Sequence, residues 1–350
     1  MPDHSRTAAA AAATLADAEA ERGMARRALQ MLVTIGVLPI LLVTMIVVFG
    51  LIEPRFLAQD NILNILRQST FLGIVAIGQM LVLITAGFDL SIGAIVALTS
   101  VVAATVMSSV LGDDGSGSAL TAIVLGVGAG LLAGIVAGAV NGFGVAVLGV
   151  SPFIVTLGTS SIITGAALLE TGGAPITGLP TDFVKVLGTD KLLGVPVVVY
   201  ITAVIVLVMY AVLNRSRFGR YLYAIGGNEI ASRLSGIRVG RNLMVVYILS
   251  GTFAAIAGLL LTARVGAGEP NLGASFALQS ITAAVLGGVS LRGGEGKLGG
   301  VVFGALFIAM LSNGMNLIRV SSYWQSIALG ALLVLAVVVD RARQRVRHTV

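Results

Sequence analysis

The sequence contains no cysteine, which excludes disulfide bonds, thiolate metal sites and cysteine nucleophiles. It contains two histidines, His4 and His348, and both lie in the terminal tails. A histidine metal cluster and a buried catalytic histidine pair are therefore excluded as well. We expect no metal site, no bound cofactor and no enzymatic centre in this chain.

Charged residues are scarce too. They make up 11% of the chain, whereas about a quarter of the residues in a soluble domain are charged. Hydrophobic residues reach 57%, and the mean hydropathy is +1.00. The 45 glycines suit spanning helices, because small residues let helix backbones approach closely. This composition predicts an all-α polytopic membrane protein.

The net charge of +6 is concentrated beside the membrane. Basic residues at the ends of spans mark topology and interact with anionic membrane lipid. We therefore expect membrane lipid as a partner and no nucleic acid.

Apolar runs predict about ten transmembrane helices, each near the 17–25 residues that cross a bilayer. The first run, residues 29–49, comes too late and is too long for a cleavable signal peptide. The other expected spans cover residues 68–86, 90–110, 119–140, 152–170, 196–213, 242–262, 277–289, 298–318 and 323–339. The expected regions are a disordered cytoplasmic tail (1–28), a transmembrane domain (29–340) and a basic cytoplasmic tail (341–350).

The distribution of lysine and arginine predicts the orientation, because these residues resist translocation. If the N-terminus lies inside, the cytoplasmic side holds 16 of the 22 basic residues. The outer side keeps Arg55, Arg67, Lys185, Lys191, Arg264 and Arg319. Both termini are therefore expected in the cytoplasm, with an even number of spans between them.

The most basic loop, residues 214–241, carries six arginines between two spans. It contains the start and stop signals of a short helix. Asn228 is a preferred N-cap residue, and Gly236 is a preferred C-terminal residue. Glu229 suits the positive helix N-terminus and lies four residues before Arg233. Two interpretations remain open: a solvated linker that only satisfies the charge bias, or a rigid helix on which another protein acts.

Asp89 lies in the segment ITAGFDLSIGA between the second and third spans. Gly87 can end one helix there, and Asp89 or Ser91 can cap the next. An acid at the centre of a span costs about 2.5–3.5 kcal/mol, so a turn is the favoured place for it. Asp89 is therefore either a helix cap or a hinge and polar contact on a transport path.

The fourth span carries a stripe of glycines at four-residue spacing, which forms a groove for a second helix. Its members are Gly126, Gly130, Gly134 and Gly138, followed by Gly142. The groove serves either packing within the chain or a dimer seam.

Gly294, Gly296 and Gly299 match the pattern G-x-G-x-x-G by letter. A dinucleotide site also needs a preceding strand and a βαβ unit, which the surrounding apolar pattern does not provide. Leu291 and Leu298 exclude a Walker A loop. We interpret the segment as a flexible turn between spans, and the chain shows no nucleotide-hydrolysing machinery of its own.

Five segments together carry a specific resemblance: AGFDLSIGA (86–94), SPFIVTLGT (151–159), TGGAPI (171–176), GRYLYAIGGNEIASRLSGI (219–237) and LGGVSLRGGEGKLGGVVFGA (286–305). In these segments the chain resembles the permease subunits of bacterial ABC importers of the ribose type, within the branched-chain amino acid/ribose permease superfamily. The resemblance covers nearly everything after residue 55.

The resemblance implies a multi-pass subunit of the bacterial inner (cytoplasmic) membrane that forms the pathway for a monosaccharide or a related small polar solute. The implied partners are a second permease subunit, identical or different, two cytoplasmic ATPase domains that use ATP and Mg²⁺, and an external sugar-binding protein. Residues 228–236 would be the coupling helix that fits a groove in the ATPase. The residues assigned to it are Asn228, Glu229, Ala231, Arg233, Leu234 and Gly236.

A transport path needs weak polar contacts, which hydroxyl and amide groups supply better than charges do. The candidates for this path are Gln79, Asp89, Asn141, Thr156 and Asn313. Thr156 belongs to a hydroxyl-rich stretch that includes Thr159, Ser160, Ser161 and Thr164. These hydroxyls either bond back to their own helix or face the solute.

Two other functions compete with this one. A self-sufficient secondary transporter requires an ion or proton site, for which Asp89 is the candidate. A membrane-embedded enzyme would find almost no residues for chemistry in this chain. The sequence specifies neither the solute nor whether the second subunit is identical.

Overall fold

The computed structural model describes residues 37–112 and 117–348. This part of the chain is almost entirely helical, as the composition predicts. Its one sheet is the antiparallel pair of β1 (Lys191–Leu192) and β2 (Val195–Pro196). The tail expected at 1–28 and the start of the first expected span lie outside the described residues.

Seven of the described helices are long and apolar enough to cross a membrane. They are α3 (Gln59–Ile84), α4 (Ile92–Leu111), α5 (Ala119–Ala146), α6 (Pro152–Thr171), α8 (Val197–Arg215), α11 (Val239–Val265) and α13 (Leu298–Leu317). The other three expected spans fall on α2 (Val37–Ile52), α12 (Phe276–Leu286) and α14 (Ser322–His348), which contain shorter apolar stretches. The chain is an all-α polytopic membrane protein.

Two boundaries among the described residues differ most from those expected. α3 begins at Gln59 rather than at 68, because the polar residues that precede the apolar run continue the same helix. α14 continues to His348 through the basic residues assigned to a separate tail.

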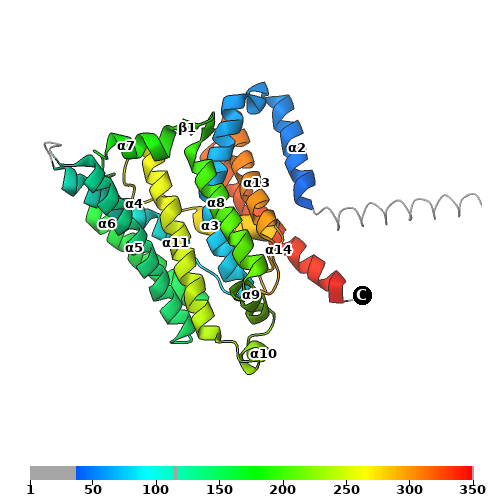
Figure 1. Ribbon diagram of the computed structural model, residues 1–350. Coiled ribbons are helices and arrows are strands. Elements are labelled where there is room, and N and C mark those ends of the chain that lie inside the picture. The colour runs from blue at the N-terminus through cyan, green and yellow to red at the C-terminus, as the bar shows by residue number, and fades with distance from the viewer. Residues whose placement is uncertain (1–36, 113–116, 349–350) are drawn as a thin grey trace, which may run out of the picture.

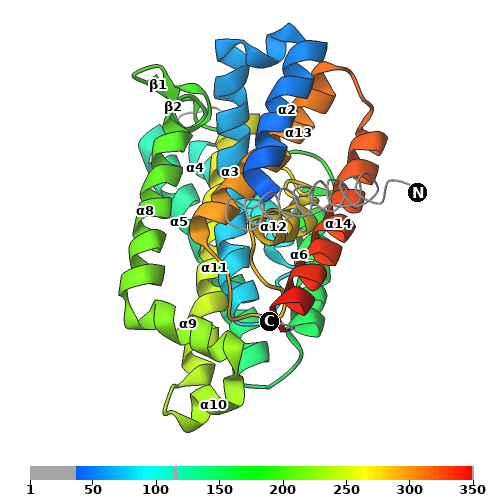
Figure 2. The same cartoon turned by 90° about the vertical axis from the view of Figure 1, so that its right-hand side faces the viewer.

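The remaining elements are short and lie at the two ends of the bundle. Figures 1 and 2 show α9 (Arg217–Gly227) and α10 (Glu229–Leu234) at one end. The opposite end carries the β1–β2 pair, α7 (Thr181–Phe183) and the π-helical η2 (Val184–Thr189), as well as η1 (Pro54–Leu57), the turn between α2 and α3. We refer to these as the α10 end and the hairpin end.

α3 and α11 form the centre of the bundle. In the most apolar stretch of each helix, the buried share is 78% in α3 and 61% in α11, whereas it is 17% in α6 and in α8. The peripheral helices expose apolar side chains such as Leu169 and Leu207. In a membrane protein such faces contact lipid or another subunit.

The glycine stripe of α5 packs inside the chain, against α4 and α11. A Cβ atom at Gly126 would lie 2.9 Å from the carbonyl oxygen of Ala103 in α4, and one at Gly134 would lie 2.7 Å from that of Gly251 in α11. A Cβ atom at Gly138 would lie 3.0 Å from the Cα of Ile248. The stripe therefore joins helices of one chain, and this face is not open to a second subunit.

Three segments interrupt the helices: 85–91, 266–275 and 287–297. α12 has 11 residues and so spans about 16 Å, roughly half of a hydrocarbon core of about 30 Å. Protein surrounds the irregular backbone beside it. Gly268 exchanges backbone hydrogen bonds with Ile176, and the amide of Glu269 donates to the Ser100 hydroxyl at 3.1 Å. Irregular backbone within a membrane protein persists where protein satisfies it in this way.

Candidate functional site: the α10 helix and a buried polar cluster

The short helix expected in the most basic loop is α10, and its local geometry is as predicted. The Asn228 side chain accepts a hydrogen bond from the amide of Ala231 at 2.9 Å, as an N-cap does. Arg233 donates to the Glu229 carboxylate at 2.8 Å one turn away. Gly236 adopts a φ of +82°, and the amides of Gly236 and Ile237 bond back to the carbonyls of Arg233 and Ser232. This pattern is a Schellman ending at the C-terminus. Together with the Asn228 cap, it fixes both ends of a six-residue helix.

α10 presents an apolar face outward. Ile230 and Leu234 lie one turn apart and are 75% and 85% exposed. Ile230 and Leu234 therefore form a small exposed apolar surface at the α10 end, which makes α10 a candidate for a protein contact. The residues predicted to make this contact all belong to α10 or its two caps.

The same loop contains a second helix, α9, which the sequence analysis missed. Ser216 caps it, because its hydroxyl accepts from the amide of Gly219 at 3.0 Å. Leu222 and Ile225 are buried, and Phe218 is packed against the main core. The spacing of these three apolar residues is helical, so the sequence contains the pattern of an amphipathic helix. The arginines of the loop make this pattern less apparent.

α9 meets two other segments at a junction of glycines. The amide of Gly294 donates to the carbonyl of Ile84, the last residue of α3, at 2.8 Å. A Cβ atom at Gly226 would overlap that same carbonyl oxygen. Gly293 and Gly294 have φ angles of +83° and +73°, which favour glycine. We call Ile84, Gly226, Gly293 and Gly294 the glycine junction.

Tyr223 makes a further link between α9 and the 287–297 segment, through a hydrogen bond from its hydroxyl to the carbonyl of Gly296 at 2.9 Å. Burial raises the pKa of the Tyr223 hydroxyl above its ordinary value, so the hydroxyl keeps its proton and donates. Gly296 and Gly294 therefore serve packing between segments, and the element directly before them is the helix α12 rather than a strand. Arg292 and Lys297 are exposed at this end.

The end of α3 corrects the expectation that Gly87 terminates this helix. The residue with a left-handed φ of +60° is Ala86, and the amides of Ala86 and Gly87 bond back to the carbonyls of Leu83 and Val82. Gly87 is instead required by packing, because a Cβ atom there would lie 2.7 Å from the Tyr247 hydroxyl.

A fully buried polar cluster, Asp89, Ser91, Asn141 and Ser250, follows this turn. One oxygen of Asp89 accepts from the amide of Ser91 at 3.0 Å and from its hydroxyl at 2.6 Å. The other oxygen accepts from the Ser250 hydroxyl of α11 at 2.7 Å. Asn141 of α5 donates to the Ser91 hydroxyl at 2.7 Å. Asp89 therefore stabilises the turn, but it also ties the 85–91 segment to α11 and, through Ser91, to α5.

Thr156 connects the same segment to α6. Its hydroxyl donates to the carbonyl of Pro152 at 2.8 Å within its own helix and accepts from the amide of Leu90 at 3.1 Å. Ser151 stands at the N-cap position of α6 and is followed by Pro152, although its side chain makes no capping bond.

Five residues carry buried side-chain polar atoms that lack a hydrogen-bond partner among the described residues. These atoms are Nε of Arg67, both ends of the Gln79 amide, the Thr105 hydroxyl, the Asn141 side-chain oxygen and the Tyr247 hydroxyl. Unsatisfied buried groups cost free energy, and in native proteins they mark strain, bound water or a second conformation. Gln79, Asp89, Asn141 and Thr156 are each fully buried in this conformation, so their role on a path stays a prediction.

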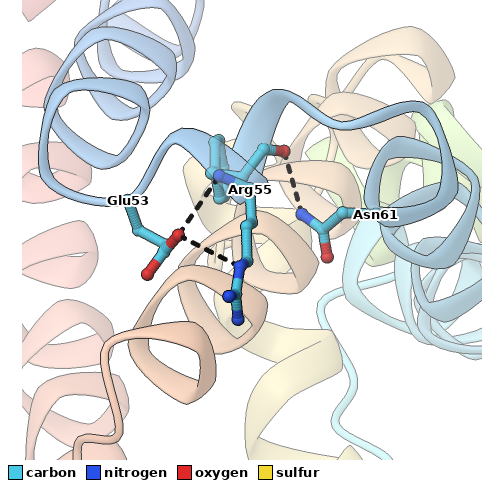
Figure 3. A network of polar contacts seen from close by, with 4 residues as sticks. Glu53, Arg55 and Asn61 are labelled. Carbon is cyan, nitrogen blue, oxygen red and sulfur yellow. Dashed lines mark hydrogen bonds and ion pairs between the residues drawn. The ribbon is translucent and has the colours of Figure 1, made fainter.

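Asn313 lies apart from the other path candidates. Its side-chain amide exchanges two hydrogen bonds with that of Asn61, at 2.9 and 3.0 Å. Figure 3 shows Asn61 beside the η1 turn at the hairpin end, where it also donates to the carbonyl of Phe56 at 2.9 Å and Glu53 accepts from the amide of Arg55. Within the described part of the chain, no group of histidine, aspartate and glutamate could hold a metal ion.

The comparisons with known proteins agree with this architecture. The sequence matches the family described as branched-chain amino acid transport system / permease component over residues 61–337. It is 40% identical to the ribose import permease protein of Haemophilus influenzae, over 86% of this chain and 91% of that protein. It is 39% identical to the ribose import permease protein of Bacillus subtilis, over 85% and 90% of the two chains. It is 37% identical to the D-allose transport system permease protein of Escherichia coli, over 86% and 90%. No solved structure matches.

Proposed function

Because the chain belongs to the family of branched-chain amino acid transport system permease components, we propose that it is the membrane-spanning permease subunit of an ATP-driven sugar importer. It is a multi-pass inner-membrane protein and a transport subunit rather than an enzyme. Ribose and D-allose are the solutes in the names of its relatives, and the solute proposed here is a monosaccharide or a related small polar molecule.

The observation that carries the proposal is the exposed, doubly capped α10. A permease subunit without its own ATP-hydrolysing site needs a rigid element that a partner ATPase can move. The caps of α10 supply rigidity, and the Ile230 and Leu234 side chains supply an apolar contact. We assign Asn228, Glu229, Ala231, Arg233, Leu234 and Gly236 to this coupling contact.

The glycine junction supports a route from α10 into the bundle. α9 ends at Gly227 and α10 begins at Glu229, so the single residue Asn228 separates the two helices. Gly226 contacts the end of α3, from which the chain enters the 85–91 segment and the polar cluster. A displacement of α10 would therefore act on α3, α5, α6 and α11 together. In this mechanism the motion switches the pathway between outward and inward access.

The subunits that assemble with this chain are also part of the proposal. It comprises a second permease subunit, two cytoplasmic ATPase domains that bind ATP and Mg²⁺, and an external sugar-binding protein. Gln79, Asp89, Asn141, Thr156 and Asn313 remain the proposed polar contacts of the pathway. Their burial suits a closed conformation, in which no continuous passage is open.

The test replaces both apolar side chains of α10 in the double variant Ile230→Ser and Leu234→Ser. The chain is reconstituted with a partner ATPase and a sugar-binding protein, and sugar uptake and ATPase binding are measured. We expect both to fall by about tenfold, because central apolar contacts dominate interface energies. Leu193→Ser is the matched control, since Leu193 is 91% exposed at the hairpin end.

Two outcomes would overturn the proposal. One is full uptake by the double variant with normal ATPase binding. The other is sugar uptake by the purified chain alone, driven by an ion gradient without any ATPase, which would make it a secondary transporter.

A further inference from the structure

We propose that a cavity between α4, α6 and residues 266–275 is a transient binding subsite for an uncharged, polyhydroxylated solute. The cavity has a volume of about 140 Å³. Its polar lining comes from Ser160 and Thr164 of α6 and from Asn271, and its other walls include Leu90, Gly93 and Ala97. We call it the loop cavity. The proposal rests on the function proposed above and names where the solute would pause.

The hydroxyls of Ser160 and Thr164 differ from three other hydroxyls of α6 in having no bond to their own helix. Thr159 shares this property but does not line the cavity. Thr156, Ser161 and Thr171 each donate to a backbone carbonyl four residues back. None of the hydrogen bonds among the described residues involves the side chain of Ser160 or Thr164. These two residues lie one turn apart on the face that lines the cavity. Their hydroxyls are therefore free to donate to and accept from a solute.

The lining selects the chemical class of the solute. None of the lining residues is charged, so neither a cation nor an anion would find a counter-charge there. Hydroxyl and amide groups alternate with small apolar residues, which suits the hydroxyl groups and C–H faces of a sugar. A second cavity of about 270 Å³ between α4 and α6 is lined by apolar side chains together with Thr105 and Glu170, so it pairs one hydroxyl with a carboxyl group instead of several uncharged polar groups.

The backbone around the loop cavity is interrupted on two sides. α4 begins at Ile92 after the 85–91 segment, and residues 266–275 separate α11 from α12. Gly273, with a φ of +80°, packs against Gly93 and Val96 so closely that a Cβ atom would lie 2.8 Å from a Val96 methyl group. Broken helices that meet inside the bundle are the usual setting of solute sites in transporters.

The cavity is also joined to the route from α10. Leu90 lines the cavity, follows Asp89 in the chain, and donates its amide to Thr156 of α6. A shift of the 85–91 segment would therefore move one wall of the cavity relative to Ser160 and Thr164. Such a coupling would release the solute when the partner ATPase changes state.

The chain has no cysteine, so a single introduced cysteine reports on one position. Ser160→Cys and Thr164→Cys are each assembled with the partner ATPase and binding protein and labelled with a small hydrophilic methanethiosulfonate during ATP turnover. Ser161→Cys is the matched control, because Ser161 is the next residue but does not line the cavity. We expect saturating ribose to slow labelling at 160 and 164 by about fivefold, because a bound solute covers the thiol and an occupancy of about four-fifths leaves about one-fifth of the rate. We expect no change at 161, and no protection at any position by glutamate.

Equal labelling at 160 and 164 with and without ribose would overturn the subsite, as would equal protection at 161. Uptake of ribose by the wild-type complex is measured in the same preparation. If the wild-type complex transports ribose and neither cysteine is protected, the subsite fails while the proposed function stands. If the wild-type complex transports no monosaccharide, the proposed function itself fails.

Discussion

The carboxyl group of Asp89 is fully buried and accepts three hydrogen bonds. The donors are the amide and hydroxyl of Ser91 and the hydroxyl of Ser250. A buried carboxyl group of this kind is tolerated only where its neighbours hydrogen-bond to it. Because Ser250 lies 161 residues away on α11, the contact holds the interrupted segment to the centre of the bundle. The residue therefore acts as both a turn former and a tie between helices.

Replacing Asp89 by alanine leaves these three donors without their acceptor. We expect Asp89→Ala to lower the free energy of unfolding by about 2–4 kcal/mol, since each orphaned buried polar group costs roughly 1–3 kcal/mol. Ser250→Ala, which removes one donor and keeps the others paired, should cost about 1 kcal/mol. Denaturant titration of the detergent-purified protein measures both. A loss below about 0.5 kcal/mol for Asp89→Ala would contradict the tie.

At single residues, the sequence predicted what local chemistry decides. The caps of α10 depend on neighbours within four residues, and Asn228, Arg233 and Gly236 were identified from them. The end of α3 was not predicted correctly, because packing against Tyr247 requires the glycine at position 87 and leaves Ala86 in the left-handed conformation. Contacts such as that between Asn141 and Ser91 cross 50 residues, and no local pattern indicates them.

At the scale of elements, α9 connects the exposed α10 to the bundle. Its buried face, Leu222 and Ile225, anchors it, and Gly226 places its backbone directly on the end of α3. The sequence predicted the helix that a partner would contact and missed the helix that carries the motion onward. The reason is that α9 has a mixed composition and joins α8 through a single residue, Ser216.

Gly226→Ala tests this connection, because its methyl group would overlap the Ile84 carbonyl. We expect uptake per ATP hydrolysed to fall by about tenfold, as overpacking costs roughly 1–3 kcal/mol, while ATPase binding to α10 stays normal. Gly227→Ala is the matched control, since no atom outside its own helix lies within 4 Å of the added methyl group.

A second variant keeps the test informative if Gly226→Ala fails to fold. Tyr223→Phe removes only the hydrogen bond to the Gly296 carbonyl and adds no atoms. It should reduce uptake per ATP by a smaller factor, about threefold to fivefold for one neutral hydrogen bond. Full coupling in both variants would show that the motion of α10 reaches the bundle by another route.

At the scale of the whole molecule, the basic residues of the two predicted inner loops lie at one end of the bundle. Arg292, Lys297 and the loop arginines share the α10 end, because Tyr223 and Gly226 join the two loops there. Lys191 lies at the hairpin end, 3.8 Å from Asp60 at the start of α3. Such an exposed pair contributes little stability, but its presence shows that the β1–β2 pair and the start of α3 lie at the same end.

The structure sorts the loops into two ends, and the positive-inside bias assigns the α10 end to the cytoplasm. This orientation is required by the proposed function, because ATP is supplied inside the cell and the solute arrives outside. Single cysteines in the cysteine-free chain test it: Ser235→Cys beside α10 and Leu193→Cys in the β1–β2 turn are both exposed. On intact spheroplasts, a membrane-impermeant thiol reagent should label position 193 at once and position 235 only after lysis. Labelling of 235 before lysis would place α10 outside the cell, where no ATPase reaches it.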